Sequence, residues 1–152
     1  MMKNMNHGDA VVLLVEDDAT VLALFSDALQ KAGFHVITAH SATEALQRAK
    51  EQRPIDVLAS DLILPDHLRL AKHPFQRPAR HGLDLMRLML KLYPTLKVVL
   101  FSGQSDDMVN GIGGIPSGTL FLRKPFSADT LVWSIRQVLA MPVQTQSSSL
   151  KS

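Results

Sequence analysis

Four short apolar runs along the chain each lead into a polar residue that can take part in chemistry. They are 11–15 before Glu16, 55–60 before Asp61, 98–101 before Ser102, and 120–122 before Lys124. Runs this short and this apolar are typical of strands that are buried on both faces. The pattern therefore predicts a parallel sheet covered by helices, with the reactive side chains gathered at one edge.

Segments with the apolar spacing of amphipathic helices alternate with these runs. Such helices are expected at 19–32, along Ala42 to Ala49, from Gly82 to the residue before Pro94, and after Ser127. The expected caps are Asp17 or Asp18, Ser41 or Thr43, and Ser127 at the starts, with Gly33 at the first helix end. The Gly-rich segment 111–116 argues against a long fourth helix.

Strands are expected near 11–15, 35–39, 56–60, 97–101 and 119–122. Strand and helix alternating in so short a chain predict an α/β fold, a doubly wound three-layer sandwich. The flavodoxin-like order 2-1-3-4-5 is expected for its five parallel strands. In that order the first and third strands are neighbours, so Asp17 and Asp61 are expected to lie close together.

Composition narrows the class of protein. A chain of 152 residues with 46% hydrophobic residues is expected to form one domain with a full core. No run of apolar residues is long enough for a membrane span, and the polar residues 1–9 do not resemble a signal peptide. The absence of cysteine fits a reducing compartment, so a cytoplasmic location is expected. A net charge of +2 gives no reason to expect nucleic-acid binding.

We expect an N-terminal extension over 1–9, the main domain over 10–141 and a disordered tail over 142–152. Within the domain, the proline-broken segment 66–81 carries four basic residues against one acidic residue, a net charge of +3. This basic insert is either an element that contacts an acidic partner or covers the site, or a solvated insertion. Its three histidines match no standard spacing of metal ligands.

Clustered carboxylates repel one another, and a divalent cation relieves that repulsion. Mg²⁺ takes oxygen ligands, which predicts direct ligation by Asp17 and Asp61 with Glu16 acting through water; Mn²⁺ is the alternative ion. An aspartate beside such an ion can attack phosphorus and form an aspartyl phosphate. Lys124 would then neutralise charge on the phosphoryl oxygens, and Ser102 would donate a hydrogen bond to one of them.

Together these motifs resemble the receiver domain of two-component response regulators, over about residues 10–140. The matching segments are Leu13 to Asp18, Asp61 followed by Leu64-Pro65, Phe101-Ser102-Gly103, and Phe121 to Phe126. The resemblance implies that Asp61 is the phosphoacceptor, that Glu16 and Asp17 are the acidic pair, and that the backbone carbonyl of Ile63 is a further metal ligand. It also implies a switch pair, Ser102 and Phe121, an essential Lys124, and a cis peptide bond between Lys124 and Pro125.

The implied donor is a histidine kinase or a histidine phosphotransfer protein, and the output is an unknown downstream protein, with a homodimer left open. No contact with nucleic acid or membrane is expected, and no enzymatic activity beyond self-phosphorylation and autodephosphorylation. The Ser102 to Asp107 segment resembles receivers of hybrid sensor kinases, so the chain is either a stand-alone receiver or a fragment of a larger protein. The alternative from another class is an interaction module that is never phosphorylated.

Overall fold

The computed structural model describes residues 10–51, 54–64, 81–103 and 118–142 of the chain. The expected N-terminal extension, the basic insert up to position 80, the Gly-rich segment and the tail beyond Pro142 lie outside the described residues. In chain order the elements are β1 (Val11–Val15), α1 (Ala19–Lys31), β2 (His35–Ala39), α2 (Ala42–Glu51), β3 (Val57–Asp61), α3 (His81–Leu92), β4 (Lys97–Ser102), β5 (Leu120–Arg123) and α5 (Ala128–Ala140).

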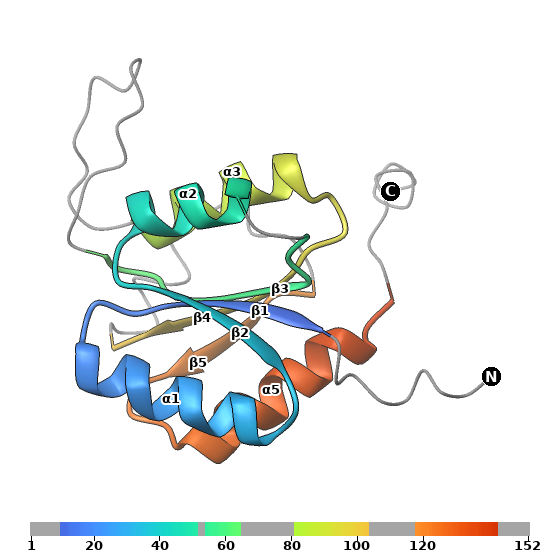
Figure 1. Ribbon diagram of the computed structural model, residues 1–152. Coiled ribbons are helices and arrows are strands. Elements are labelled where there is room, and N and C mark those ends of the chain that lie inside the picture. Colours follow the sequence, from blue (N-terminus) through green and yellow to red (C-terminus); the bar gives the residue numbers. More distant parts are fainter. Residues whose placement is uncertain (1–9, 52–53, 65–80, 104–117, 143–152) are drawn as a thin grey trace.

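The five strands form one parallel sheet in the order β2-β1-β3-β4-β5, as predicted. Figure 1 shows α1 and α5 covering one face of the sheet and α2 and α3 covering the other. The register pairs Val15 with Ser60, Asp61 with Phe101, and Ser102 with Arg123. The carboxyl ends of β1, β3, β4 and β5 therefore meet at one edge, which confirms the predicted location of the reactive side chains.

Alternate residues of each central strand enter two separate cores. In β1, Leu13 and Val15 pack with α2 and α3, whereas Val12 and Leu14 pack with α1 and α5. All five residues of β1 are buried, which is why the sequence is continuously apolar rather than alternating. Each such side chain contributes about 1.5–3 kcal/mol through its removal from water. These cores fix the strands whose ends carry the polar residues.

The structure shows which residues cap the helices where the sequence offered two candidates. Asp18 is the N-cap of α1, where its Oδ1 accepts hydrogen bonds from the backbone N–H groups of Thr20 and Val21 at 2.9 and 3.1 Å. Ser41 accepts from the backbone N–H of Glu44 at the start of α2. Ser127 caps α5 as predicted, and Gly33 takes a positive φ of 101° at the end of α1. Asp17 thus remains available at the edge of the sheet.

Three strands end one residue later than expected. We expected β3, β4 and β5 to end at Ser60, Phe101 and Leu122, but they end at Asp61, Ser102 and Arg123. The reason is that backbone pairing continues in register past the apolar side chains, since the ladder does not depend on side-chain polarity. Two of the reactive side chains therefore project from the sheet itself, which holds them more rigidly than a loop would.

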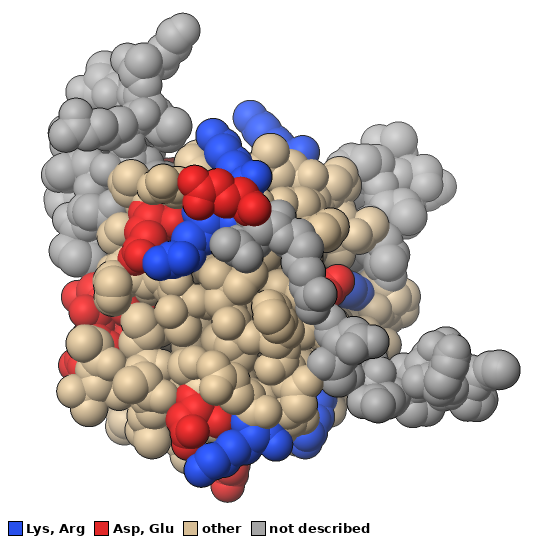
Figure 2. Space-filling model, viewed as in Figure 1, with Lys and Arg blue, Asp and Glu red and all other residues tan. Residues whose placement is uncertain are grey.

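On the face drawn in Figure 2, basic side chains lie beside acidic ones at the top and bottom of the view, and acidic side chains gather at its left edge, so the described residues form no single basic patch on this face. Lys31 pairs with Asp27 on α1, and Arg48 pairs with Glu44 on α2. The described helices include none with the length and apolar character that crossing a membrane requires.

One buried hydroxyl gives a prediction about stability. Ser134 on α5 is fully buried, and its Oγ has no hydrogen-bond partner among the described residues. A hydroxyl desolvated in this way costs about 1–3 kcal/mol. We therefore expect Ser134→Ala to raise the free energy of unfolding by about 1 kcal/mol, measured by chemical denaturation. The control Ser127→Ala removes the α5 cap and should lower it. A destabilised Ser134→Ala protein would contradict this account.

Candidate metal and phosphoacceptor site

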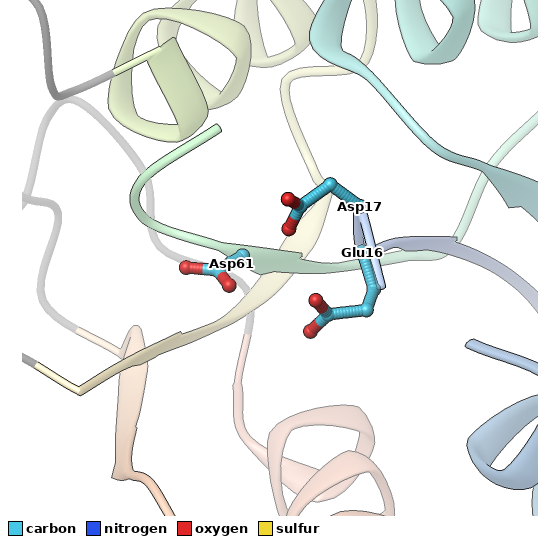
Figure 3. Close-up of side chains that lie close together, drawn as sticks. All are labelled: Glu16, Asp17 and Asp61. Carbon is cyan, nitrogen blue, oxygen red and sulfur yellow. The ribbon is translucent and has the colours of Figure 1, made fainter. Parts of the chain in front are cut away.

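Three carboxylates converge at the carboxyl edge of the sheet. Glu16 and Asp17 follow β1, and Asp61 is the last residue of β3. One oxygen from each lies within 4.8 Å of the others, and Figure 3 shows the three side chains turned toward a common space. Glu16 and Asp61 are buried, with residue exposures of 1% and 6%, whereas Asp17 is exposed. The predicted acidic cluster is therefore present.

Lys124 reaches into this cluster from the residue after β5. Its Nζ donates a hydrogen bond to Asp61 Oδ2 at 2.5 Å and another to Glu16 Oε1 at 3.3 Å. Its backbone N–H donates to the carbonyl of Ser102 at 2.9 Å, which ties it to the end of β4. The peptide bond between Lys124 and Pro125 is cis, as predicted. Lys124 is thus held in place by hydrogen bonds of both its ammonium and its backbone N–H.

Burial and charge act in opposite directions at these groups. Burial raises the pKa of Glu16, and the negative charge of Asp61 adds to this, while the N–H of Asp18 and the ammonium of Lys124 oppose it; the net pKa is raised. Burial lowers the pKa of Lys124, but its hydrogen bond to Asp61 and the two carboxylate charges outweigh burial, so that pKa is raised. The Lys124 ammonium therefore stays charged beside a Glu16 carboxylate that is costly to ionise.

The backbone after Asp61 is also fixed. The N–H of Ile63 donates to Asp61 Oδ1 at 3.0 Å, so each oxygen of this carboxylate has its own donor. The N–H of Leu62 donates to the carbonyl of Phe101 at 2.8 Å. The Asp61 carboxylate is thus oriented by its own chain as well as by Lys124.

The two predicted switch residues occupy different environments. Ser102 ends β4 and is buried, next to Lys124 through the backbone hydrogen bond already described. Phe121 lies in β5, paired with Leu100, and is partly buried against the core formed with α2 and α3. Ser102 and Phe121 therefore lie on the neighbouring strands β4 and β5, of which β4 pairs with β3.

The structure contains an aromatic cluster next to Lys124 that the sequence did not predict. Phe101 lies 5.9 Å from the Lys124 ammonium, measured to the ring centroid, and contacts Phe126 edge-on at 5.4 Å. Phe25 of α1 stacks on Phe126 at 5.3 Å. The only available signal was that two of these rings are neighbours of site residues in the sequence, which does not reveal that they meet in space.

The donor set fits a small, hard divalent cation. All three candidate ligand atoms are carboxylate oxygens, and the cluster of three carboxylates and one ammonium has an excess of negative charge. Their span of 4.8 Å is close to the distance of about 4 Å between opposite ligands of octahedral Mg²⁺. Glu16, Asp17 and Asp61 are therefore a candidate ligand set for such an ion.

The sheet order and this acidic edge define a doubly wound α/β protein with a candidate metal centre. The chain belongs to the family of response regulator receiver domains, whose family model matches residues 12–136. The predicted family and the predicted strand order are both confirmed. The chain is thus a receiver domain of the kind found in response regulators and hybrid kinases, and a phosphoacceptor role in two-component signalling is consistent with this membership.

The chain is similar to part of a transcriptional regulatory protein and to part of a sensor kinase. The chain is 33% identical over 134 residues to the probable transcriptional regulatory protein TcrX of Mycobacterium tuberculosis, covering 87% of this chain and 51% of TcrX. It is 31% identical over 135 residues to the sensor kinase CckA of Brucella abortus, covering 87% of this chain and 13% of CckA. The chain therefore spans about half of one relative and a small part of the other.

The chemotaxis response regulator CheY4 of Vibrio cholerae is a similar solved structure. It superimposes with a TM-score of 0.68 at 26% sequence identity, covering 86% of this chain and 98% of CheY4. The similarity therefore extends over almost the whole of a known receiver structure.

Proposed function

We propose that Asp61 accepts a phosphoryl group from a histidine kinase or a histidine phosphotransfer protein in a reaction that depends on a divalent cation. The observation that carries this proposal is the hydrogen bond from Lys124 Nζ to Asp61 Oδ2, beside two further carboxylates. In the transfer, the N–P bond of the phosphohistidine breaks and an O–P bond to Asp61 forms. A cytoplasmic location goes with this proposal, because there the histidine donor is phosphorylated from ATP.

The residues of the site have distinct roles in this proposal. Lys124 neutralises charge on the transferring phosphoryl group, and Ser102 donates a hydrogen bond to one of its oxygens. Glu16, Asp17, Asp61 and the backbone carbonyl of Ile63 hold Mg²⁺, or Mn²⁺ in its place. The ion supplies further positive charge to the phosphoryl oxygens when it is bound. The chain itself turns over only its own phosphoryl group.

The test is phosphorylation of the full chain by acetyl phosphate with Mg²⁺, followed by intact mass spectrometry. We expect one added phosphoryl group in the wild type and none in Asp61→Asn. The matched control is Asp27→Asn, which changes an exposed aspartate on α1 and should leave the reaction unchanged. Wild-type protein that gains no phosphoryl group, and does not respond to beryllofluoride by NMR, would instead favour an interaction module that is never phosphorylated.

Phosphorylation is expected to alter the surface around β5, α5 and the predicted fourth helix, whose segment lies outside the described residues. In this proposal Ser102 moves toward the phosphoryl group, and Phe121 turns inward into the space that becomes free. The partly buried state of Phe121 is compatible with either direction of movement. The downstream partner, a homodimer among the candidates, would bind the changed surface.

The lifetime of the aspartyl phosphate gives a separate prediction. Ile63 is partly buried and apolar. In this proposal it flanks the position that an attacking water would use. Because an apolar side chain does not order that water, we expect slow hydrolysis, and Ile63→Asn should speed the decay severalfold. Decay is followed by loss of the phosphorylated mass after the donor is removed. Ile63→Val is the control and should decay as the wild type does; an unchanged or slower rate in Ile63→Asn contradicts the idea.

A further inference from the structure

Gly82, the second residue of α3, lies unusually close to the end of β3. A Cβ atom added there would lie 2.1 Å from the carbonyl oxygen of Asp61 and 2.8 Å from that of Leu62. Real Cβ atoms essentially never approach closer than 3.0 Å, and both neighbours are backbone atoms that cannot rotate away. Gly82 does not have a positive φ, so the requirement for glycine is steric rather than conformational.

This approach connects α3 to the turn that carries the acceptor. The N–H of Gly82 donates a hydrogen bond to the carbonyl of Leu62 at 3.0 Å. The same turn is held from the other side by the N–H of Leu62, which donates to Phe101 on β4, and internally by the N–H of Ile63. The backbone from Asp61 to Ile63 is therefore clamped between β4 and the first turn of α3.

We infer that Gly82 is a positioning residue for the site, because its missing side chain lets α3 set the direction of the Asp61 carboxylate and of the Ile63 carbonyl. The inference rests on the proposed function and deepens it. Any side chain at position 82 must push α3 away from the carboxyl end of β3 or tilt the Asp61–Leu62 peptide. Displacements of about 1 Å in such groups can cost about 100-fold in rate.

The first test compares two glycine variants of the full chain. Gly82→Ala acts next to the site, whereas Gly33→Ala places a side chain at a positive φ of 101° at the end of α1 and lowers stability for an unrelated reason. Both are titrated with Mn²⁺ alone, and both are phosphorylated with acetyl phosphate and Mg²⁺. In Gly82→Ala we expect the Kd for Mn²⁺ to rise about tenfold or more and phosphorylation to slow. In Gly33→Ala we expect the Kd and the rate of phosphorylation to be unchanged.

A folded Gly82→Ala protein with the wild-type Kd for Mn²⁺ would overturn the inference, because position 82 would then serve packing alone. Failure of the proposed function looks different, since the wild type itself would then gain no phosphoryl group, whatever its Kd for Mn²⁺. If Gly82→Ala does not fold, the wild type still decides by NMR during a Mg²⁺ titration. The amide resonance of Gly82 should shift in parallel with that of Ile63; a Gly82 resonance that stays fixed overturns the inference.

Discussion

Lys124→Met is expected to slow phosphorylation of Asp61 by about 100-fold or more, because it removes a preorganised positive charge at the site of transfer. The Lys124 ammonium lies 2.5 Å from Asp61 Oδ2 and 3.3 Å from Glu16 Oε1. Methionine preserves much of the apolar length of the side chain, so the loss reports on charge more than on packing. The rate is measured with acetyl phosphate at saturating Mg²⁺ by intact mass.

The same variant is expected to bind Mg²⁺ more tightly. In the wild type the ammonium competes with the cation for the oxygens of Asp61 and Glu16, and its removal leaves those carboxylates without their cationic partner. The unfolding free energy without metal should fall by about 1–3 kcal/mol for the same reason. A slower reaction together with a lower Kd for Mg²⁺ separates this role from general damage to the site.

Lys31→Met is the control for these measurements. Lys31 pairs with Asp27 on the surface of α1, with side-chain exposures of 78% and 61%, and such a pair contributes little to stability. It should be phosphorylated, bind Mg²⁺ and unfold as the wild type does. A Lys124→Met protein phosphorylated at the wild-type rate would remove Lys124 from the mechanism.

The approximate position of every site residue can be predicted from the sequence because the carboxyl ends of parallel strands lie at the same edge of the sheet. Once β1 and β3 are neighbours, the residues after Val15 and Ser60 must meet at the same edge. What could not be predicted depends on packing between distant segments. Either Asp17 or Asp18 could have capped α1, and only the hydrogen bonds from Thr20 and Val21 assign that role to Asp18.

Gly82 illustrates the same limit more sharply. In the sequence it marks the point where a helical pattern resumes, and nothing local indicates how closely that helix approaches β3. Its contact with the Asp61 carbonyl depends on the tilt of α3, which is set by packing of side chains such as Leu85, Met86 and Met89 in the core. The short contact is therefore a property of the fold, even though it acts on the predicted acceptor.

Glu16→Gln is expected to stabilise the metal-free protein at neutral pH and to weaken its response to Mg²⁺. Burial raises the pKa of Glu16 above its ordinary value of 4.5, so the folded state holds the proton more tightly than the unfolded state does. The stability that this group contributes is fully present below pH 4.5 and is lost as the pH rises through the folded-state pKa. Glutamine stays neutral, so the advantage of the variant should appear at pH 7 and vanish in acid.

Bound Mg²⁺ is expected to stabilise the wild type more than it stabilises Glu16→Gln. At a concentration about tenfold above its Kd, bound Mg²⁺ adds about 1.4 kcal/mol to the stability of the wild type, a rise of about 3–6 °C in Tm. Glu16→Gln lacks one carboxylate of the cluster and should gain less. The exposed Glu51→Gln on α2 is the matched control and should follow the wild type. If Glu16→Gln gained as much from Mg²⁺ as the wild type, Glu16 would not belong to the metal site, and the cost of its burial would need another explanation.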